Sequence, residues 1–175
     1  MGEPAARTPS PGVLSDAEKA LIKDTWRLIE PIRDTAADLF YRRLFELKPE
    51  YRSLFKNNMD AQKRKLVGML AFIVKSLSWP DSMWQEEVDP ENDLFLVVLA
   101  LGRRHRELYA IPPESYATVR DVLLWTMDYG LGEAFTPNAR DAWARVYDLV
   151  AMTMKMGEGA TDMGKPMSED EGSAS

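Results

Sequence analysis

His105 is the only histidine of this 175-residue chain, and the chain contains no cysteine. The absence of cysteine excludes disulfides, thiolate metal sites, iron–sulfur clusters and cysteine nucleophiles. A single imidazole also excludes a zinc site built from several histidines. Haem needs only one protein ligand, an imidazole that projects from a helix into an apolar slot and leaves the opposite iron face open to a gas. A lone histidine is also often hydrogen-bonded in a core or exposed, so the residue alone leaves both interpretations open.

The composition is typical of one soluble globular domain. Apolar residues make up 45% of the chain, charged residues make up 29%, and the net charge is -6. Nucleic acids and anionic membranes are bound through basic patches, which this sequence does not concentrate anywhere. The start of the chain lacks the pattern of a signal peptide, and no stretch approaches the ~18 to 20 apolar residues of a membrane helix. We therefore expect no nucleic-acid or membrane partner and a cytoplasmic location.

Apolar residues recur at helical spacing between two polar tails, and these helices must position His105. Residues 1–13 and the acidic residues 157–175 are expected to be disordered, which leaves 14–156 as the folded domain. No segment alternates like a strand, so we predict an all-α fold of about six or seven helices. The first begins with a capping box, Ser15-Asp16-Ala17-Glu18, and ends before Pro31. Others are expected over 32–47, 60–77 and 94–108, after Pro113, and from Thr136-Pro137 onward.

The segment that contains His105, Leu101-Gly102-Arg103-Arg104-His105, resembles the proximal-histidine segment of bacterial single-domain globins and of the globin domain of flavohaemoglobins. The resemblance extends over about residues 14–156. Its other matching segments are Asp38 to Phe45 (helix B), Lys48 to Glu50 (helix C), Ser53 to Phe55 (the corner that follows), Gln62 to Leu66 (helix E) and Pro113 to Tyr116 (helix G). It implies a globin fold without a D helix and a haem b group whose iron is bound by His105.

The same resemblance assigns residues to the two sides of the haem. Tyr41 and Gln62 would lie on the distal side, where a phenol and a carboxamide can donate hydrogen bonds to bound dioxygen. Their alternatives are a core tyrosine and a surface glutamine. Phe55 would pack against the haem and Leu66 would cover the ligand, although both residue types are also common in ordinary cores.

On the proximal side, Leu101 and Tyr116 would belong to the cofactor-binding residues. The resemblance would bring Tyr116 close to the imidazole, with Glu158 as a carboxylate partner of His105. Lys65, Arg103 and Arg104 would pair with the haem propionates, their alternative being ordinary solvated side chains.

The main departure from the family is a long connection between helices E and F, residues 78–93. We interpret this segment as a surface loop. Alternatively, its tryptophans Trp79 and Trp84 cover the haem edge or form a dimer contact.

Three classes of function fit these features. The first is a haem protein that reversibly binds dioxygen, nitric oxide or carbon monoxide and acts in transport, storage, scavenging or sensing. The second is a nitric oxide dioxygenase that depends on an external reductase. The third is a haem-free interaction module, which the presence of Tyr41, Phe55, Gln62 and His105 argues against. A monomer or a weak homodimer is expected.

Overall fold

Five α-helices form the part of the chain that the computed structural model describes, which is residues 14–55, 58–78 and 114–159. No strand occurs within these ranges, and the all-α prediction is confirmed. The expected helix over 94–108, with Leu101, Arg103, Arg104 and His105, lies outside the described residues, as does the 79–93 part of the long connection. In chain order the elements are α1 (Asp16–Ile29), η1 (Glu30–Ile32), α2 (Arg33–Leu47), η2 (Pro49–Leu54), α3 (Met59–Ser76), α5 (Ser115–Leu131), η4 (Gly132–Ala134) and α6 (Pro137–Gly159).

The start of α1 is fixed by the capping box that the sequence predicts. The Glu18 backbone N–H donates to the Ser15 hydroxyl oxygen at 3.2 Å, and the Ser15 backbone N–H donates to the Glu18 carboxylate at 2.8 Å. These two bonds satisfy donors that the first helical turn leaves unpaired. The same carboxylate accepts a hydrogen bond at 2.7 Å from the guanidinium of Arg145 in α6. The Glu18 side chain therefore both caps α1 and connects it to α6.

Proline and glycine set the other boundaries. Pro31 lies in the short 3₁₀ helix η1 between α1 and α2, and Pro49 opens η2 directly after α2. Gly132 ends α5 with a φ of 53°, a conformation that a residue without a Cβ adopts at little cost. Thr136 caps α6, since its hydroxyl accepts a 3.2 Å hydrogen bond from the Ala139 N–H. Helix α6 continues to Gly159, past residue 156 at which we placed the end of the folded domain.

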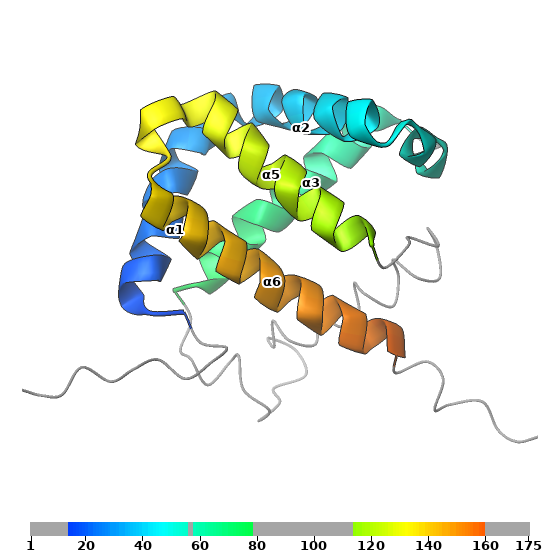
Figure 1. Cartoon of the computed structure of the whole chain (residues 1–175). Coiled ribbons are helices and arrows are strands. Elements are labelled where there is room, and N and C mark those ends of the chain that lie inside the picture. Colours follow the sequence, from blue (N-terminus) through cyan, green and yellow to red (C-terminus); the bar gives the residue numbers. More distant parts are fainter. Residues whose placement is uncertain (1–13, 56–57, 79–113, 160–175) are drawn as a thin grey trace, which may run out of the picture.

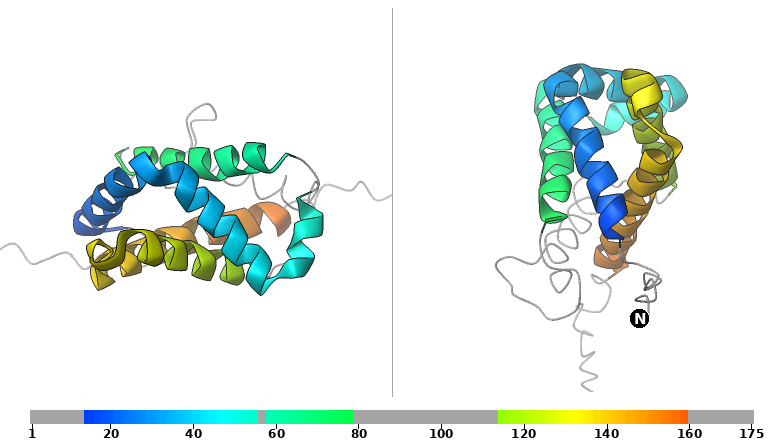
Figure 2. Two further views of the ribbon diagram at one scale, coloured as in Figure 1. Left: turned by 90° about the horizontal axis from the view of Figure 1, so that it is seen from above. Right: turned by 90° about the vertical axis from the view of Figure 1, so that its left-hand side faces the viewer.

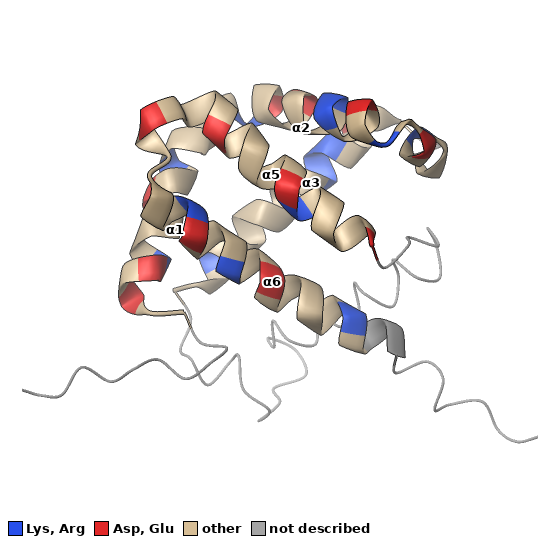
Figure 3. Cartoon of the chain, in the orientation of Figure 1, with Lys and Arg blue, Asp and Glu red and all other residues tan. Residues whose placement is uncertain are grey.

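Helices α5 and α6 form one side of the molecule, α3 forms the opposite side, and α1 and α2 run between them. In Figure 1, α5 and α6 lie on the near side of the molecule and α3 lies behind them. Figure 2 shows the same arrangement from two other directions, with α1 and α2 running between the two sides. Charged residues are interspersed along α1, α2, α5 and α6 (Figure 3).

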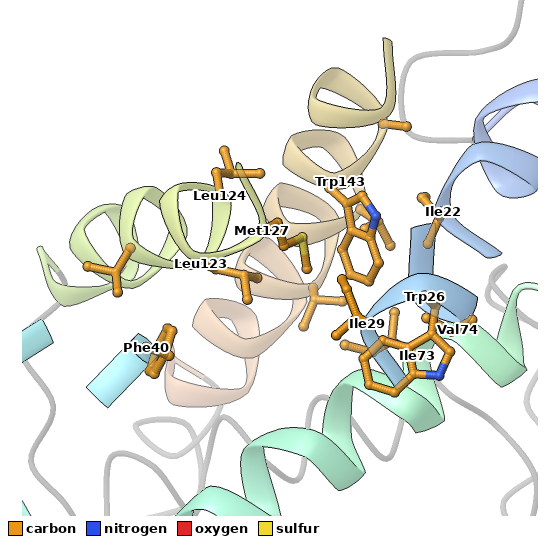
Figure 4. Packing of buried hydrophobic residues seen from close by; sticks show 14 of the residues in the cluster. Ile22, Trp26, Ile29, Phe40, Ile73, Val74, Leu123, Leu124, Met127 and Trp143 are labelled. Atoms are coloured by element: carbon orange, nitrogen blue, oxygen red, sulfur yellow. The ribbon is translucent and has the colours of Figure 1, made fainter. Parts of the chain in front are cut away.

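A single apolar cluster fills the space between these helices. Trp143 of α6 faces Ile22 and Ile29 of α1 (Figure 4), and Trp143 and Ile22 are almost completely buried. Phe40 of α2 and Met127 of α5 continue the cluster toward the other end of the molecule. Within the described ranges, no helix is both long enough and apolar enough to cross a membrane.

Candidate functional site

Tyr41 and Gln62, which the sequence predicts to share one side of a ligand site, come together in the structure. Tyr41 lies in α2 with 7% of its surface exposed, and Gln62 lies in the first turns of α3 with 8% exposed. The Tyr41 hydroxyl donates a hydrogen bond to the backbone carbonyl of Gln62, with 3.3 Å between the two oxygens. This distance is longer than the usual range for an O–H···O bond, so the bond is weak.

An aromatic group holds the Tyr41 ring. The ring makes edge contacts with Phe40 at 5.1 Å and with Phe55 at 5.5 Å between centroids, and a tilted contact with Phe45 at 6.0 Å. Phe45 and Phe55 contact each other at 5.6 Å. These are preferred geometries for aromatic pairs. Phe55, predicted to pack against a flat cofactor, therefore belongs to the same wall as Tyr41.

Leu66 and Lys65 occupy different environments one helical turn after Gln62. Leu66 is half-buried and packs against the core, and its predicted place over a bound ligand stays a prediction. Lys65 is exposed, and its role toward a propionate stays a prediction.

An ion pair that sequence reasoning missed joins the two helices of this wall. The ammonium of Lys63 in α3 contacts the carboxylate of Asp38 in α2, and Asp60 lies 3.7 Å from the same ammonium. The hydrogen bond with Asp38 is the main reason that the pKa of Lys63 is raised above its usual range. The contact bridges α2 and α3 close to Tyr41 and Gln62.

Tyr116 lies at the start of α5, and the contacts described for it do not involve Tyr41 or Gln62. It is buried, its backbone carbonyl accepts a 2.9 Å hydrogen bond from the Tyr147 hydroxyl of α6, and the Lys155 ammonium lies 5.2 Å from its ring. Burial holds the pKa of Tyr147 well above its usual range, so this phenol is a neutral donor at physiological pH.

Ser115, the neighbour of Tyr116, connects α5 to η2. Its hydroxyl donates to the hydroxyl of Tyr51 at 2.9 Å, and both residues are buried. Sequence reasoning did not single out Ser115, Tyr51 or Tyr147. The only local signal was the occurrence of polar groups on otherwise apolar helix faces.

The predicted iron ligand lies outside the described residues, together with Leu101, Arg103 and Arg104, and the side chain of Glu158 is likewise not described. Within residues 14–55, 58–78 and 114–156, no group of three or more histidine, cysteine, aspartate or glutamate side chains could hold a metal ion. The role of His105 as iron ligand stays a prediction from the sequence.

The chain is similar to known proteins. A family model described as globin matches residues 38–154. The chain is 30% identical over 148 residues to neuroglobin of Tetraodon nigroviridis, a match that covers 82% of this chain and 92% of that protein. It is 26% identical over 131 residues to a flavohemoprotein of Bacillus subtilis, covering 75% of this chain and 31% of that protein. The solved structure of the engineered carbene transferase RmaNOD of Rhodothermus marinus has the same fold, with a TM-score of 0.70, 20% identity, and coverage of 86% of this chain and 97% of that one.

Proposed function

Because the chain belongs to the globin family, we propose that it binds haem b through His105 and holds a diatomic gas beside Tyr41 and Gln62. The observation that carries the proposal is the buried Tyr41 hydroxyl, which is held by an aromatic group and points at the backbone of Gln62. The haem would supply the iron centre at which dioxygen, nitric oxide or carbon monoxide binds.

The described side chains fit one wall of a haem pocket. Phe55 and Leu66 offer apolar contacts to a flat macrocycle and to a small gas, and the surrounding core excludes water. Lys65 is exposed at this wall and would pair with a propionate, with Arg104 as a second cation. Leu101 and Tyr116 would complete the opposite side, next to His105.

The Tyr41 hydroxyl is suited to donate a hydrogen bond to a bound gas molecule. Its hydrogen bond to the Gln62 carbonyl is long, so exchanging this bond for one to a gas molecule would give up little. The carboxamide of Gln62 would add a second donor from α3. The Lys63–Asp38 contact bridges the two helices that carry these donors.

The absorbance spectrum of the purified, haem-reconstituted chain tests this proposal. We expect a Soret band that shifts when carbon monoxide is added to the reduced protein. His105→Ala should lose the five-coordinate imidazole spectrum, and added imidazole should restore it, which controls for misfolding. An unchanged spectrum in His105→Ala would show that another residue binds the iron, and the lack of any Soret band after reconstitution would reject haem binding.

A second candidate function, nitric oxide dioxygenation, is favoured by the match to a flavohemoprotein and by the distal Tyr41 and Gln62. RmaNOD is itself provisionally assigned as a nitric oxide dioxygenase. The overall reaction combines nitric oxide, dioxygen and one electron to give nitrate, and a reductase partner would supply that electron. Stopped-flow mixing of the oxygenated protein with nitric oxide should then yield nitrate, and turnover should continue only with a reductase present. Reversible gas binding without nitrate formation would exclude this candidate.

A further inference from the structure

Positively charged side chains surround the wall that Tyr41, Phe55 and Gln62 form. From Asp38 to Leu66, the described residues include seven Lys and Arg against four Asp and Glu, although the whole chain has a net charge of -6. The end of α2, η2 and the start of α3 lie at the same end of the molecule (Figure 1), so these charges share one region. The cations come from three elements, and only the fold brings them together.

Every carboxylate of this region already has a cation partner. The pairs are Asp38 and Asp60 with Lys63, Glu46 with Arg43, and Glu50 with Lys48. Four exposed cations remain, and none of them forms an ion pair with another described residue: Arg42, Arg52, Arg64 and Lys65. The region therefore presents an excess of positive charge to the solvent on an acidic chain.

Two of these cations lie directly beside the aromatic part of the wall. Arg42 follows Tyr41 in α2. The guanidinium of Arg52 in η2 lies 5.1 Å from the centre of the Phe45 ring, and that ring contacts Phe55 at 5.6 Å. Both cations therefore border the side chains that we place next to a haem.

The other two cations lie in α3, directly after the buried Gln62. Arg64 and Lys65 are consecutive, and both are exposed. Lys65 is the residue that we assign to a propionate. Arg42, Arg52 and Arg64 are then the cations that a second molecule can contact, and we call them the basic rim.

We propose that the basic rim is the docking surface for a small acidic protein that carries one electron. The proposal rests on the haem function proposed above. A ferric haem must be reduced before it binds dioxygen again, and the carrier would be oxidised by the one electron that the haem gains. Such complexes are weak and use small interfaces, and complementary charge raises the rate at which their partners meet.

The charge of the rest of the chain favours a small protein over other polyanions. Nucleic acids and anionic membranes extend beyond the basic rim, so they would also meet the remainder of a chain whose net charge is -6. A protein with one acidic face can contact the rim alone.

Two double variants provide a matched comparison. Arg42→Gln/Arg64→Gln removes two charges of the rim. Arg33→Gln/Lys75→Gln removes two exposed cations from the opposite ends of the same two helices, and neither of these cations has an ion pair with a described residue. The two variants have the same net charge, and both should bind carbon monoxide as the unaltered chain does.

The probe is plant-type ferredoxin, an acidic iron–sulfur protein that carries one electron. Oxidised ferredoxin should shift the amide NMR signals of the basic rim in the full-length, haem-reconstituted chain with carbon monoxide bound. The binding should weaken between about 0.01 and 0.1 M salt, because the screening length falls from about 30 to about 10 Å. Reduced ferredoxin should reduce the ferric form of Arg42→Gln/Arg64→Gln at least about fivefold more slowly at low salt, and that of Arg33→Gln/Lys75→Gln less than about twofold more slowly.

The remaining outcomes separate this inference from its alternatives. It is overturned if ferredoxin shifts the signals of other elements, if both double variants are reduced equally slowly, or if ferredoxin docks and does not reduce the haem. It is also overturned if a duplex oligonucleotide or vesicles that contain phosphatidylserine bind the rim in preference to ferredoxin. Absence of docking to a chain that binds haem and carbon monoxide would overturn the docking surface and leave the haem proposal standing. Docking to a chain without a Soret band would support the docking surface and reject the haem proposal.

Discussion

Replacing Tyr41 with phenylalanine should speed the release of dioxygen. The change removes one hydroxyl and keeps the ring, together with its contacts to Phe40 and Phe55 at 5.1 and 5.5 Å. A hydrogen bond to a partly negative ligand in a dry site contributes about 1 to 3 kcal/mol, from which the weak bond to the Gln62 carbonyl must be subtracted. A net loss of about 1 to 2 kcal/mol corresponds to a dissociation rate roughly 5 to 30 times higher.

Stopped-flow displacement of dioxygen by carbon monoxide measures this rate. Tyr147→Phe is the matched control, because it removes a phenol that donates to the backbone carbonyl of Tyr116 at 2.9 Å and not to Gln62. The control should release dioxygen at nearly the rate of the unaltered chain. An unchanged or slower rate in Tyr41→Phe, or an equal acceleration in Tyr147→Phe, would refute the role of Tyr41 as the distal donor.

Four further substitutions test the fold and the site. Burial tends to raise the pKa of Glu18, but hydrogen bonds from the helix start and from Arg145 outweigh it and hold the pKa below its usual value of 4.5. Glu18→Gln should therefore lose about 1 to 2 kcal/mol of unfolding free energy at pH 7, and urea titrations should show this difference shrinking as the pH falls below the usual pKa. Gly132→Ala should lower the free energy of unfolding by about 1 to 3 kcal/mol, because Gly132 has a positive φ. Gly68→Ala, within α3, should raise the free energy of unfolding by roughly 0.5 to 1 kcal/mol. Equal effects of the two substitutions would contradict the positive φ of Gly132. Phe55→Ala loses two aromatic contacts, which together are worth about 1 to 3 kcal/mol. Haem transfer from this variant to apomyoglobin should therefore be faster. An unchanged transfer rate would show that Phe55 does not contact the haem.

Local signals in the sequence were sufficient for most helix boundaries. Ser15 and Thr136 cap the helices that they were expected to cap, and Pro31 separates the first two. Each of these signals acts through hydrogen bonds or backbone angles within a few residues, so it can be read without knowledge of the tertiary structure. The end of the last helix was less predictable. The helix continues to Gly159, and glycines in this segment are compatible both with a helix and with a disordered tail.

The candidate site was predictable only in part. The family resemblance placed Tyr41 and Gln62 on one side of the site and Phe55 against the haem, and the structure brings these three residues together. The direction of the Tyr41 hydroxyl, toward a backbone carbonyl, could not be inferred from residue types. The hydrogen bond between Ser115 and Tyr51 was equally inaccessible, because it joins residues 64 positions apart whose proximity depends on how α5 packs. The role of His105 stays a prediction.

The link between Glu18 and Arg145 bears on how the chain folds as it is made. The two residues are 127 positions apart, so α1 leaves the ribosome long before its partner in α6 is synthesised. The helix cap can form at once, because it needs only neighbouring residues, whereas the contact with α6 closes a long loop whose entropy cost must be met by packing elsewhere. We expect the first helix of the nascent chain to complete its tertiary contacts only after α6 has been made, although it also packs against α3 and α5. Until then its apolar face, with Ile22 and Trp26, is available to chaperones.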